Sequence, residues 1–307
     1  MLAIGAGALG SAFQHGYNTG VVNAPQSLVS EFIADTYKAR FSEPATDSTI
    51  KLVYSLLVSV FCVGGMLGAL LTAYVADKLG RKGGLVWNNF LVVIAAALMG
   101  FARACRSYEM LILGRFFSGL NSGLNAGLAP MYLAEISPNH LRGAIGTIYQ
   151  LVITISILLS NVLGLPQLLG TSENWPSLFG LIIIPAVFMV CTLPLCPESP
   201  KYILLMQSRE VNAQRALTWL RGTIEVHDKM DEMRAEYEQM KLVPRVTLSE
   251  LWYNASLRQP LIISLMVMMS QQFSGINAAI SFSTDIFKSA GLNEQAALYS
   301  TMGECFV

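Results

Sequence analysis

The chain alternates long apolar stretches without charge and short clusters of charged residues. The uncharged stretches cover residues 1–30, 52–76, 83–102, 116–134, 143–172, 174–197 and 259–284. Most of them exceed the roughly 18 apolar residues that a helix needs to cross a lipid bilayer. The pattern predicts seven membrane-spanning helices and the beginning of an eighth near Gln295. Because no basic segment precedes residues 1–22 and polar residues interrupt them, we interpret them as a span and not as a secretory signal peptide.

The composition agrees with this pattern. Hydrophobic residues make up 53% of the 307 residues and charged residues only 13%, against about 25% charged residues in an average soluble domain. The net charge of zero gives no indication of a nucleic-acid partner. The five cysteines show no metal-ligand spacing and are interpreted as apolar packing residues. We find no nucleophile–base pair, metal cluster or phosphate-binding loop, so the sequence predicts no enzyme, no metal and no cofactor.

The charged segments orient the predicted spans. Basic residues gather in 77–82, 135–142 and 198–258, which fall on one side of the membrane if the spans alternate. The positive-inside rule assigns this side, and with it the N-terminus, to the cytoplasm. We therefore predict an all-α, multi-pass membrane protein in three parts: an N-terminal six-span half (1–197), a cytoplasmic helical linker (198–258), and the start of a C-terminal half with span seven and part of span eight (259–307). Since residues 301–307 cannot complete a crossing, the chain is expected to be incomplete.

The fourth span carries a stripe of small residues. Gly119, Gly123 and Gly127 are spaced by four, which lets two helix backbones approach closely in lipid. Arg115 opens the same span. It fits an anchor at the membrane interface and a buried charge with a partner equally well.

The predicted cytoplasmic turns hold opposite charges. Asp77 and Arg81 lie after the second span, and Glu135 and Arg142 lie after the fourth. Such charges at helix ends can latch one conformation of a moving bundle. Together with Arg115 they are our candidates for a conformational gate. The alternative is ordinary topology charge, which we favour for Lys82 alone.

Three spans carry polar residues on their faces. The sets are Ser11, Gln14, His15, Asn18 and Thr19 in span one; Thr147, Gln150, Thr154 and Asn161 in span five; and Ser270, Ser274, Asn277 and Ser281, with Gln271 and Gln272 beside them, in span seven. Because side-chain amides are costly in hydrocarbon, these faces are expected to line a shared aqueous cavity. Gly275 weakens the helix of span seven and predicts a break there.

These three spans contain no Asp, Glu, Lys or Arg. An amide donates and accepts hydrogen bonds, which suits a neutral solute with many hydroxyl groups. Proton-coupled carriers usually need a titratable group within the membrane. His15 is the candidate for that role, but the absence of carboxylates favours passive uniport.

Several motifs together resemble the facilitative glucose transporters, the sugar-porter branch of the major facilitator superfamily. They are GYNTGVVNAPQ (16–26), GRFFSGLNSGLNAGLAPMYLAEISPNHLRGA (114–144), GTIYQL (146–151), PESPKYIL (197–204) and QQFSGIN (271–277). The resemblance covers essentially the whole chain. It implies a hexose carrier of the plasma membrane that works by alternating access.

The resemblance also implies roles for single residues. In that family, the residues that match Gln150, Gln271, Gln272 and Asn277 hydrogen-bond the sugar, and apolar residues that match Ile153 and Ile157 line the same pocket. Those that match Arg81, Glu135 and Arg142 belong to the cytoplasmic charge network. Proton-coupled relatives have an aspartate at the position of Asn18.

The chain departs from the family pattern near span seven. Met268, Met269 and Ser270 replace a frequent Gln-Leu-Ser, and Ser281 and Phe282 replace a frequent tyrosine pair. Glucose and fructose therefore both remain as substrates. The alternatives to a glucose uniporter are a fructose-preferring uniporter, a proton-coupled sugar or polyol carrier, and a non-transporting truncated isoform or regulatory partner of a full-length transporter. A homo-oligomer, or pairing with a full-length transporter, remains open. The expected partners are a small neutral sugar and the lipid bilayer.

Overall fold

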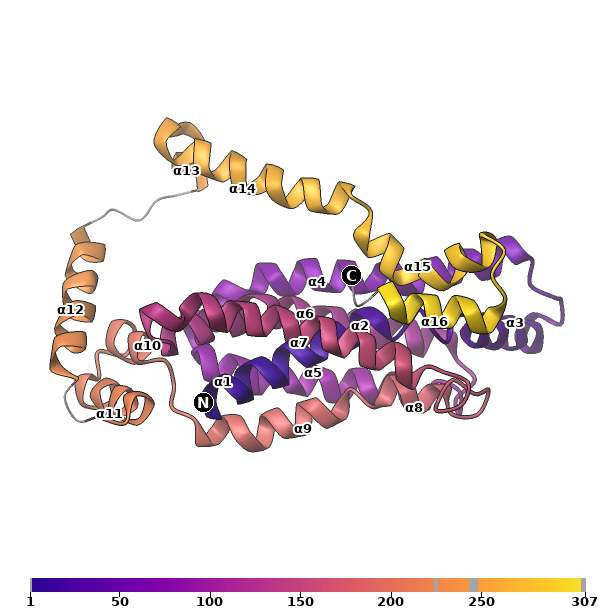
Figure 1. The fold of residues 1–307 in the computed structure, drawn as a ribbon, viewed down its shortest axis with the longest axis horizontal. Helices are drawn as coiled ribbons and strands as arrows, with labels where there is room; N and C mark the ends of the chain where they lie inside the picture. Colours follow the sequence, from indigo (N-terminus) through magenta and orange to yellow (C-terminus); the bar gives the residue numbers. More distant parts are fainter. Residues whose placement is uncertain (1, 224–225, 243–247, 305–307) are drawn as a thin grey trace.

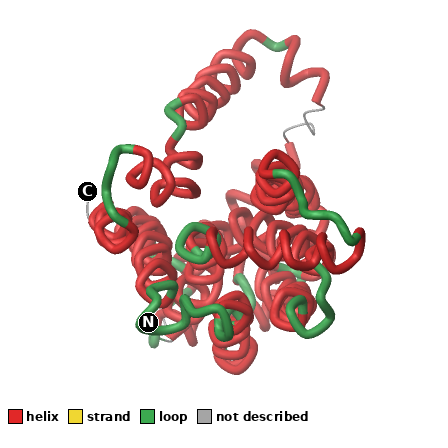
Figure 2. The backbone as a smooth tube through the Cα atoms, turned by 90° about the vertical axis from the view of Figure 1, so that its right-hand side faces the viewer, coloured by secondary structure: helices red, strands yellow, loops and turns green. Residues whose placement is uncertain are grey.

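The computed structural model describes residues 2–223, 226–242 and 248–304, which form helices and loops without a strand among them (Figures 1 and 2). The N-terminal part contains α1 (Leu2–Gly7), the π-helical turn η1 (Ala8–Ala12), α2 (Phe13–Gly20), α3 (Gln26–Phe41), α4 (Asp47–Leu79), α5 (Arg81–Phe101), α6 (Tyr108–Ile136), the short turn η2 (Asn139–Leu141), α7 (Arg142–Leu163), α8 (Trp175–Gly180), α9 (Ile183–Thr192) and the turn η3 (Leu193–Leu195). The remainder contains α10 (Pro200–Leu205), α11 (Glu210–Arg221), α12 (His227–Leu242), α13 (Leu248–Tyr253), α14 (Ala255–Phe273), α15 (Ile276–Ser289) and α16 (Glu294–Glu304).

Five helical segments of the described chain are long and apolar enough to cross a membrane. They are Asp47–Leu79, Arg81–Phe101, Arg142–Leu163, Trp175–Leu195 and Ala255–Ser289. The sequence pattern also predicted spans for the helical run Leu2–Gly20 and for α6. These two are not among the five, because their glycine and polar residues make them less apolar. Both lie inside the bundle, where their polar side chains contact protein.

The predicted glycine stripe brings α6 against α4. A Cβ atom on Gly119 would lie 2.1 Å from the carbonyl oxygen of Phe61, and one on Gly123 would lie 2.1 Å from that of Gly65. The contact is reciprocal, since a Cβ atom on Gly64 of α4 would lie 2.3 Å from the carbonyl oxygen of Phe116. Only residues without a side chain allow this backbone approach.

A second pair of glycines, which the sequence analysis did not single out, joins α2 to α7. A Cβ atom on Gly16 would lie 2.1 Å from Ser156 Oγ, and one on Gly20 would lie 2.2 Å from Ser160 Oγ. Gly16 and Gly20 on α2 are four residues apart, as are Ser156 and Ser160 on α7. Small residues of the two helices therefore meet along one line. The spacing of Gly16 and Gly20 was the signal for this contact.

Buried amides join α2, α5 and α6. Gln14 Nε2 donates to Asn89 Oδ1 at 2.8 Å and Gln14 Oε1 accepts from Asn125 Nδ2 at 3.1 Å. Asn125 Oδ1 in turn accepts from Asn88 Nδ2 at 3.0 Å. We call these four residues, with Asn121 beside them, the amide cluster. Since its members are at most 2% exposed, their hydrogen bonds replace water and hold the three helices in one register.

The predicted linker is helical where it is described. Helix α11 ends at Gly222, whose φ of +69° places it in the left-handed conformation that closes helices. Helix α12 buries Met230 and Met233 against Leu217 of α11. These helices lie at the end of the bundle where α10 follows α9 (Figure 1).

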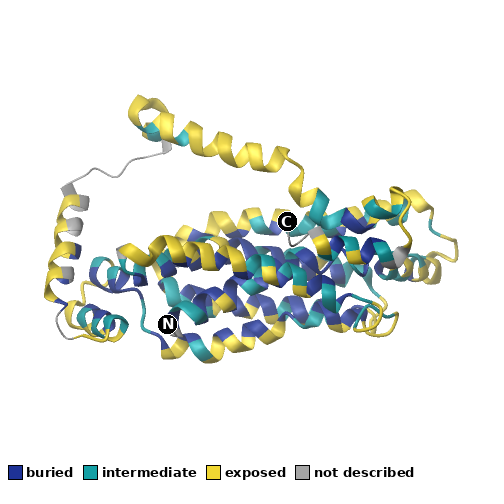
Figure 3. Cartoon of the chain, viewed as in Figure 1, coloured by how far each residue is buried: buried dark blue, intermediate teal, exposed yellow. Residues whose placement is uncertain are grey.

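Helix α14 differs from every long helix of the N-terminal part because none of its residues is buried. It stands apart from the bundle (Figure 3), whereas α15 and α16 pack against the bundle at the end that carries α3. The chain turns between α14 and α15 at Gly275, with a φ of +74°. The break predicted at this glycine is therefore confirmed.

Candidate functional site

Helix α7 presents the predicted polar face of span five. Gln150 is exposed, Thr154 and Ile157 are partly buried, and Asn161 is 4% exposed. The Thr154 hydroxyl donates to the Gln150 carbonyl oxygen at 3.3 Å, a bond within its own helix. The Gln150 amide is therefore the most accessible long polar side chain of this face.

Only part of the polar set of span one is accessible. Ser11 and Gln14 are fully buried and Asn18 is 1% exposed. Asn18 Nδ2 donates to the Gln14 carbonyl oxygen at 2.9 Å, while Gln14 itself belongs to the amide cluster. The structure therefore assigns these residues to helix packing and not to a cavity. His15 and Thr19, four residues apart, are partly buried.

The polar residues of span seven flank the break at Gly275. Gln271, Gln272 and Asn277 are exposed, and Asn277 Nδ2 donates to Gln272 Oε1 at 2.7 Å across the break. The structure thus brings Gln272 and Asn277 together. It does not bring them to Gln150, because α14 stands away from the bundle (Figure 3).

The N-terminal part of the chain holds α15 beside α2 and α3. Asn23 Nδ2 donates to Ser283 Oγ at 2.7 Å, and Asn23 Oδ1 accepts from the Thr284 backbone N–H at 3.4 Å. Gln26 also donates to the Asp285 carboxylate. A cavity of about 890 Å³ lies beside these contacts, between α3, α4 and α15. Polar contacts therefore fasten α15 to the bundle at this end.

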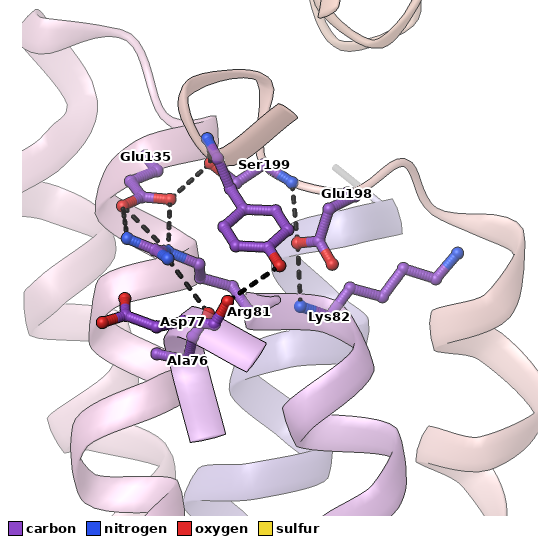
Figure 4. Close-up of polar contacts among 8 residues, drawn as sticks. Ala76, Asp77, Arg81, Lys82, Glu135, Glu198 and Ser199 are labelled. Carbon is purple, nitrogen blue, oxygen red and sulfur yellow. Dashed lines mark hydrogen bonds and ion pairs between the residues drawn. The ribbon is translucent and has the colours of Figure 1, made fainter. Parts of the chain in front are cut away.

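The opposite end holds the predicted charge cluster (Figure 4). Arg81 Nε lies 3.1 Å from Glu135 Oε2, and Arg81 Nη2 lies 3.0 Å from Glu135 Oε1, so the ion pair is bidentate. The two side chains are only 15% and 16% exposed. The Arg81 guanidinium also lies 5.1 Å from the ring centroid of Tyr202. The pair joins the start of α5 to the end of α6.

Glu198 and Ser199 complete this cluster, and the sequence analysis did not assign them a role. Glu198 Oε1 accepts from the Lys82 backbone N–H at 2.9 Å, in the first turn of α5, where a carboxylate meets the positive end of the helix dipole. The Ser199 hydroxyl donates to the Glu135 carboxylate. The motif PESPKYIL contained both residues, but nothing in its spacing showed that they reach α5 and α6.

The remaining gate candidates do not all lie together. Tyr202 Oη donates to the Asp77 backbone carbonyl at 3.1 Å, while the Asp77 side chain is exposed. Arg142 Nε donates to the Ala134 carbonyl oxygen at 3.2 Å. Both are therefore next to the cluster of Arg81 and Glu135.

Arg115 lies elsewhere, near the start of α6. It is 1% exposed, donates to the Asn18 carbonyl oxygen at 2.7 Å and lies 4.4 Å from the ring centroid of Phe61. Twenty residues of helix separate it from Glu135, about 30 Å of rise. Of the two readings from the sequence, the structure supports the buried, partnered charge, and it separates Arg115 from the charge cluster.

Acidic, histidine and cysteine side chains do not gather into a metal site within the described ranges.

Known proteins resemble the chain over nearly its whole length. The family described as "Sugar (and other) transporter" matches residues 4–306. Solute carrier family 2, facilitated glucose transporter member 1 of Gallus gallus is 43% identical over 303 residues, which are 99% of this chain and 61% of the relative. Facilitated glucose transporter protein 1 of Caenorhabditis elegans is 43% identical over 293 residues, 95% of this chain and 57% of the relative. The chain thus spans about 60% of the length of these relatives.

A solved structure shares the fold. The partially occluded, inward-open xylose transporter XylE from E. coli matches with a TM-score of 0.79 and 20% identity, over 99% of this chain and 69% of XylE. Another XylE structure with the same TM-score of 0.79 is described as a major facilitator superfamily proton:xylose symporter. At this identity the likeness shows the fold alone, of which our chain covers the N-terminal part. Taken with the family match over residues 4–306, these findings show that the chain belongs to the sugar transporter family, with the major facilitator fold.

Proposed function

We propose that this protein carries a neutral hexose, glucose first of all, across a membrane by facilitative uniport. The observation that carries the proposal is the kind of polar group that α7, α14 and α15 leave accessible: the side-chain amides of Gln150, Gln271, Gln272 and Asn277. Amides replace the hydrogen bonds that sugar hydroxyls make with water. The relatives named above are facilitated glucose transporters, which supports the same substrate class here.

The proposed sugar site lies between α7 and the break in span seven. Gln150, Gln271, Gln272, Asn277 and Thr19 would bond the hydroxyls, and Ile153 and Ile157 would pack against the ring. Several hydrogen bonds, each netting about 0.5–1.5 kcal/mol, give weak binding. A millimolar Kd corresponds to about −4 kcal/mol, which allows the sugar to leave on the far side.

Alternating access requires Gln271 and Gln272 to approach Gln150. Helix α15 is fastened to the bundle through Asn23, while α14 stands away from it. The left-handed Gly275 lies between the two helices. We propose that α14 swings about this glycine, so that the amides of span seven close on α7 around the sugar.

The charge cluster is the proposed conformational gate. Arg81 and Glu135, with Asp77 and Arg142 beside them, lie where the predicted cytoplasmic linker begins. Through Ser199 the cluster also holds α10, so the linker would move together with the N-terminal part. Arg115, which the sequence analysis grouped with the gate, would instead hold α2 and α6 together.

We propose a plasma-membrane location with the N-terminus and the linker in the cytoplasm. Cys105 is exposed in the turn between α5 and α6, on the proposed outer side. A membrane-impermeant maleimide should therefore label Cys105 in intact cells, and Cys105→Ser should remove this label. Labelling of Cys105 only after permeabilisation would reverse the orientation.

Uptake of radiolabelled sugars by transporter-deficient cells that express the protein tests the function. We expect saturable uptake of glucose that Gln150→Ala abolishes, with surface biotinylation to show equal amounts of both proteins. Preferred uptake of fructose would change the substrate but not the mechanism. Sugar-driven proton entry would replace uniport by proton coupling. A protein that reaches the surface, moves no sugar and lowers uptake by a co-expressed relative would instead be a regulatory partner.

A further inference from the structure

Consecutive residues of α2 face different neighbours, because a helix turns by about 100° per residue. Gln14 faces α5 and α6, since its Nε2 donates to Asn89 Oδ1 at 2.8 Å. Gly16 faces α7, since a Cβ atom there would lie 2.3 Å from the Ile153 carbonyl oxygen. His15, between them in sequence, therefore points into the sector between α6 and α7.

The same division recurs one turn later in α2. The Asn18 carbonyl oxygen accepts from Arg115 of α6 at 2.7 Å. A Cβ atom on Gly20 would lie 3.1 Å from the Ile157 carbonyl oxygen of α7. Thr19, between these two contacts, shares the sector with His15, and its hydroxyl donates to the His15 carbonyl oxygen at 3.0 Å.

His15 and Thr19 form a strip along α2 that borders the proposed sugar site. The proposed apolar walls are Ile153 and Ile157, whose backbone touches the two glycines that border the strip on its α7 side. His15 and Thr19 are partly buried, unlike the fully buried Gln14. The strip is thus the side of α2 that a solute lying against both α2 and α7 would meet.

Two polar atoms here lack hydrogen-bond partners within the described part of the chain. His15 Nδ1 and Ser122 Oγ are both buried, and the imidazole lies against the Ser122 backbone. Buried polar atoms of folded proteins are nearly always hydrogen-bonded, so a pair of unpartnered ones in one place requires an explanation. A neutral imidazole offers one donor and one acceptor, and a serine hydroxyl offers both.

We propose that His15, with Ser122 beside it, binds a hydroxyl group of the transported hexose and thereby selects among hexoses. The inference rests on the proposed function, because it places a further contact in the same site. It assigns to the N-terminal part a polar contact on α2 in addition to Gln150 on α7. A hexose that presents a hydroxyl at this position binds more tightly than one that lacks it.

Binding to the purified protein in lipid nanodiscs tests the proposal. Saturation-transfer NMR would give the Kd for glucose, fructose and each monodeoxyglucose, with wild type, His15→Phe and His15→Gln. The exposed His140→Phe is the matched control, and Gln150→Ala tests the proposed function separately. Melting temperatures of all variants show whether they remain folded.

We expect His15→Phe to raise the Kd for glucose about fivefold, the loss expected for one neutral hydrogen bond. For one monodeoxyglucose, which lacks the contacted hydroxyl, the Kd should be the same in wild type and His15→Phe. His15→Gln, which keeps a donor and an acceptor, should restore part of the affinity, and His140→Phe should change nothing.

The proposal fails if His15→Phe leaves every Kd unchanged or raises all of them by one common factor. If Gln150→Ala weakens binding while the His15 variants do not, the further inference alone is lost. If the His15 pattern appears while Gln150→Ala binds normally, His15 remains and the proposed role of Gln150 is lost. A wild-type protein that binds no hexose overturns both.

Discussion

Helices α6 and α14 use the same kind of side chain in opposite ways. The amides of Asn121 and Asn125 in α6 are buried and bonded to neighbouring helices. The amides of Gln271 and Gln272 in α14 are exposed. An amide with partners in the bundle fixes helix positions, whereas an accessible amide is available to a ligand. Polar residues in a membrane span therefore divide into two classes that only their surroundings distinguish.

The strongest test of the packed region is Gly123→Ala in α6. The new Cβ atom would lie 2.1 Å from the Gly65 carbonyl oxygen, and backbone on both sides cannot move away without separating α4 from α6. We expect a loss of about 3 kcal/mol in the free energy of unfolding, the upper end of the usual cost of overpacking. The melting temperature in detergent measures it. Gly100→Ala, where no atom lies within 4 Å, is the control, and equal melting temperatures would contradict the close contact.

Removing one buried amide should cost somewhat less. Asn125→Leu leaves Gln14 Oε1 and Asn88 Nδ2 without the Asn125 amide that they bond. We expect a loss of about 2–3 kcal/mol, the cost of unpaired buried polar groups. Thermal unfolding monitored by circular dichroism measures it. A variant as stable as wild type would show that the amide cluster does not hold these helices.

The charge cluster should give a smaller, local effect. Glu135→Gln keeps the shape of the side chain but removes the charge that faces Arg81 and Ser199. Because hydrogen bonds to charged groups contribute about 1.5–3 kcal/mol and this pair is partly exposed, we expect a loss of about 1–2 kcal/mol. Hydrogen exchange should accelerate in α10. The control Glu43→Gln changes an exposed side chain and should leave hydrogen exchange in α10 unchanged. An unchanged rate in Glu135→Gln as well would show that the cluster does not hold the linker.

The smallest effect on stability is expected in α14. Gln271→Ala changes an exposed side chain, so the free energy of unfolding should change by no more than about 0.5 kcal/mol. Sugar affinity should nevertheless fall if Gln271 contacts the ligand. Parallel melting and sugar-binding measurements separate the two quantities. A large loss of stability would place Gln271 in the same class as Asn125 and remove the contrast between the helices.

Part of the site was predictable from local pattern. The stripe of Gly119, Gly123 and Gly127 predicted a close helix contact, and Gly275 predicted the break in span seven; the structure confirms both. These features depend on spacing along one helix and on the conformational freedom of one residue. Features of this kind can therefore be predicted from the sequence alone.

Other features needed the fold. Gln14 and His15 are adjacent and both polar, yet one is locked in the amide cluster and the other faces the sector beside α7. Arg115 was grouped with Glu135 by charge, but the length of α6 separates them.

The sequence by itself determined the succession of apolar helices, the membership of the family and the residue types that we propose to contact a sugar, because hydrophobic length and local motifs can be read along the chain. The tertiary structure decided which amides are structural and that Glu198 and Ser199 join the cluster of Arg81. It also leaves one ring nitrogen of His15 without a partner among the described residues. These outcomes depend on the rotation of each helix about its axis and on contacts between residues far apart in the chain. A local sequence pattern determines neither of them.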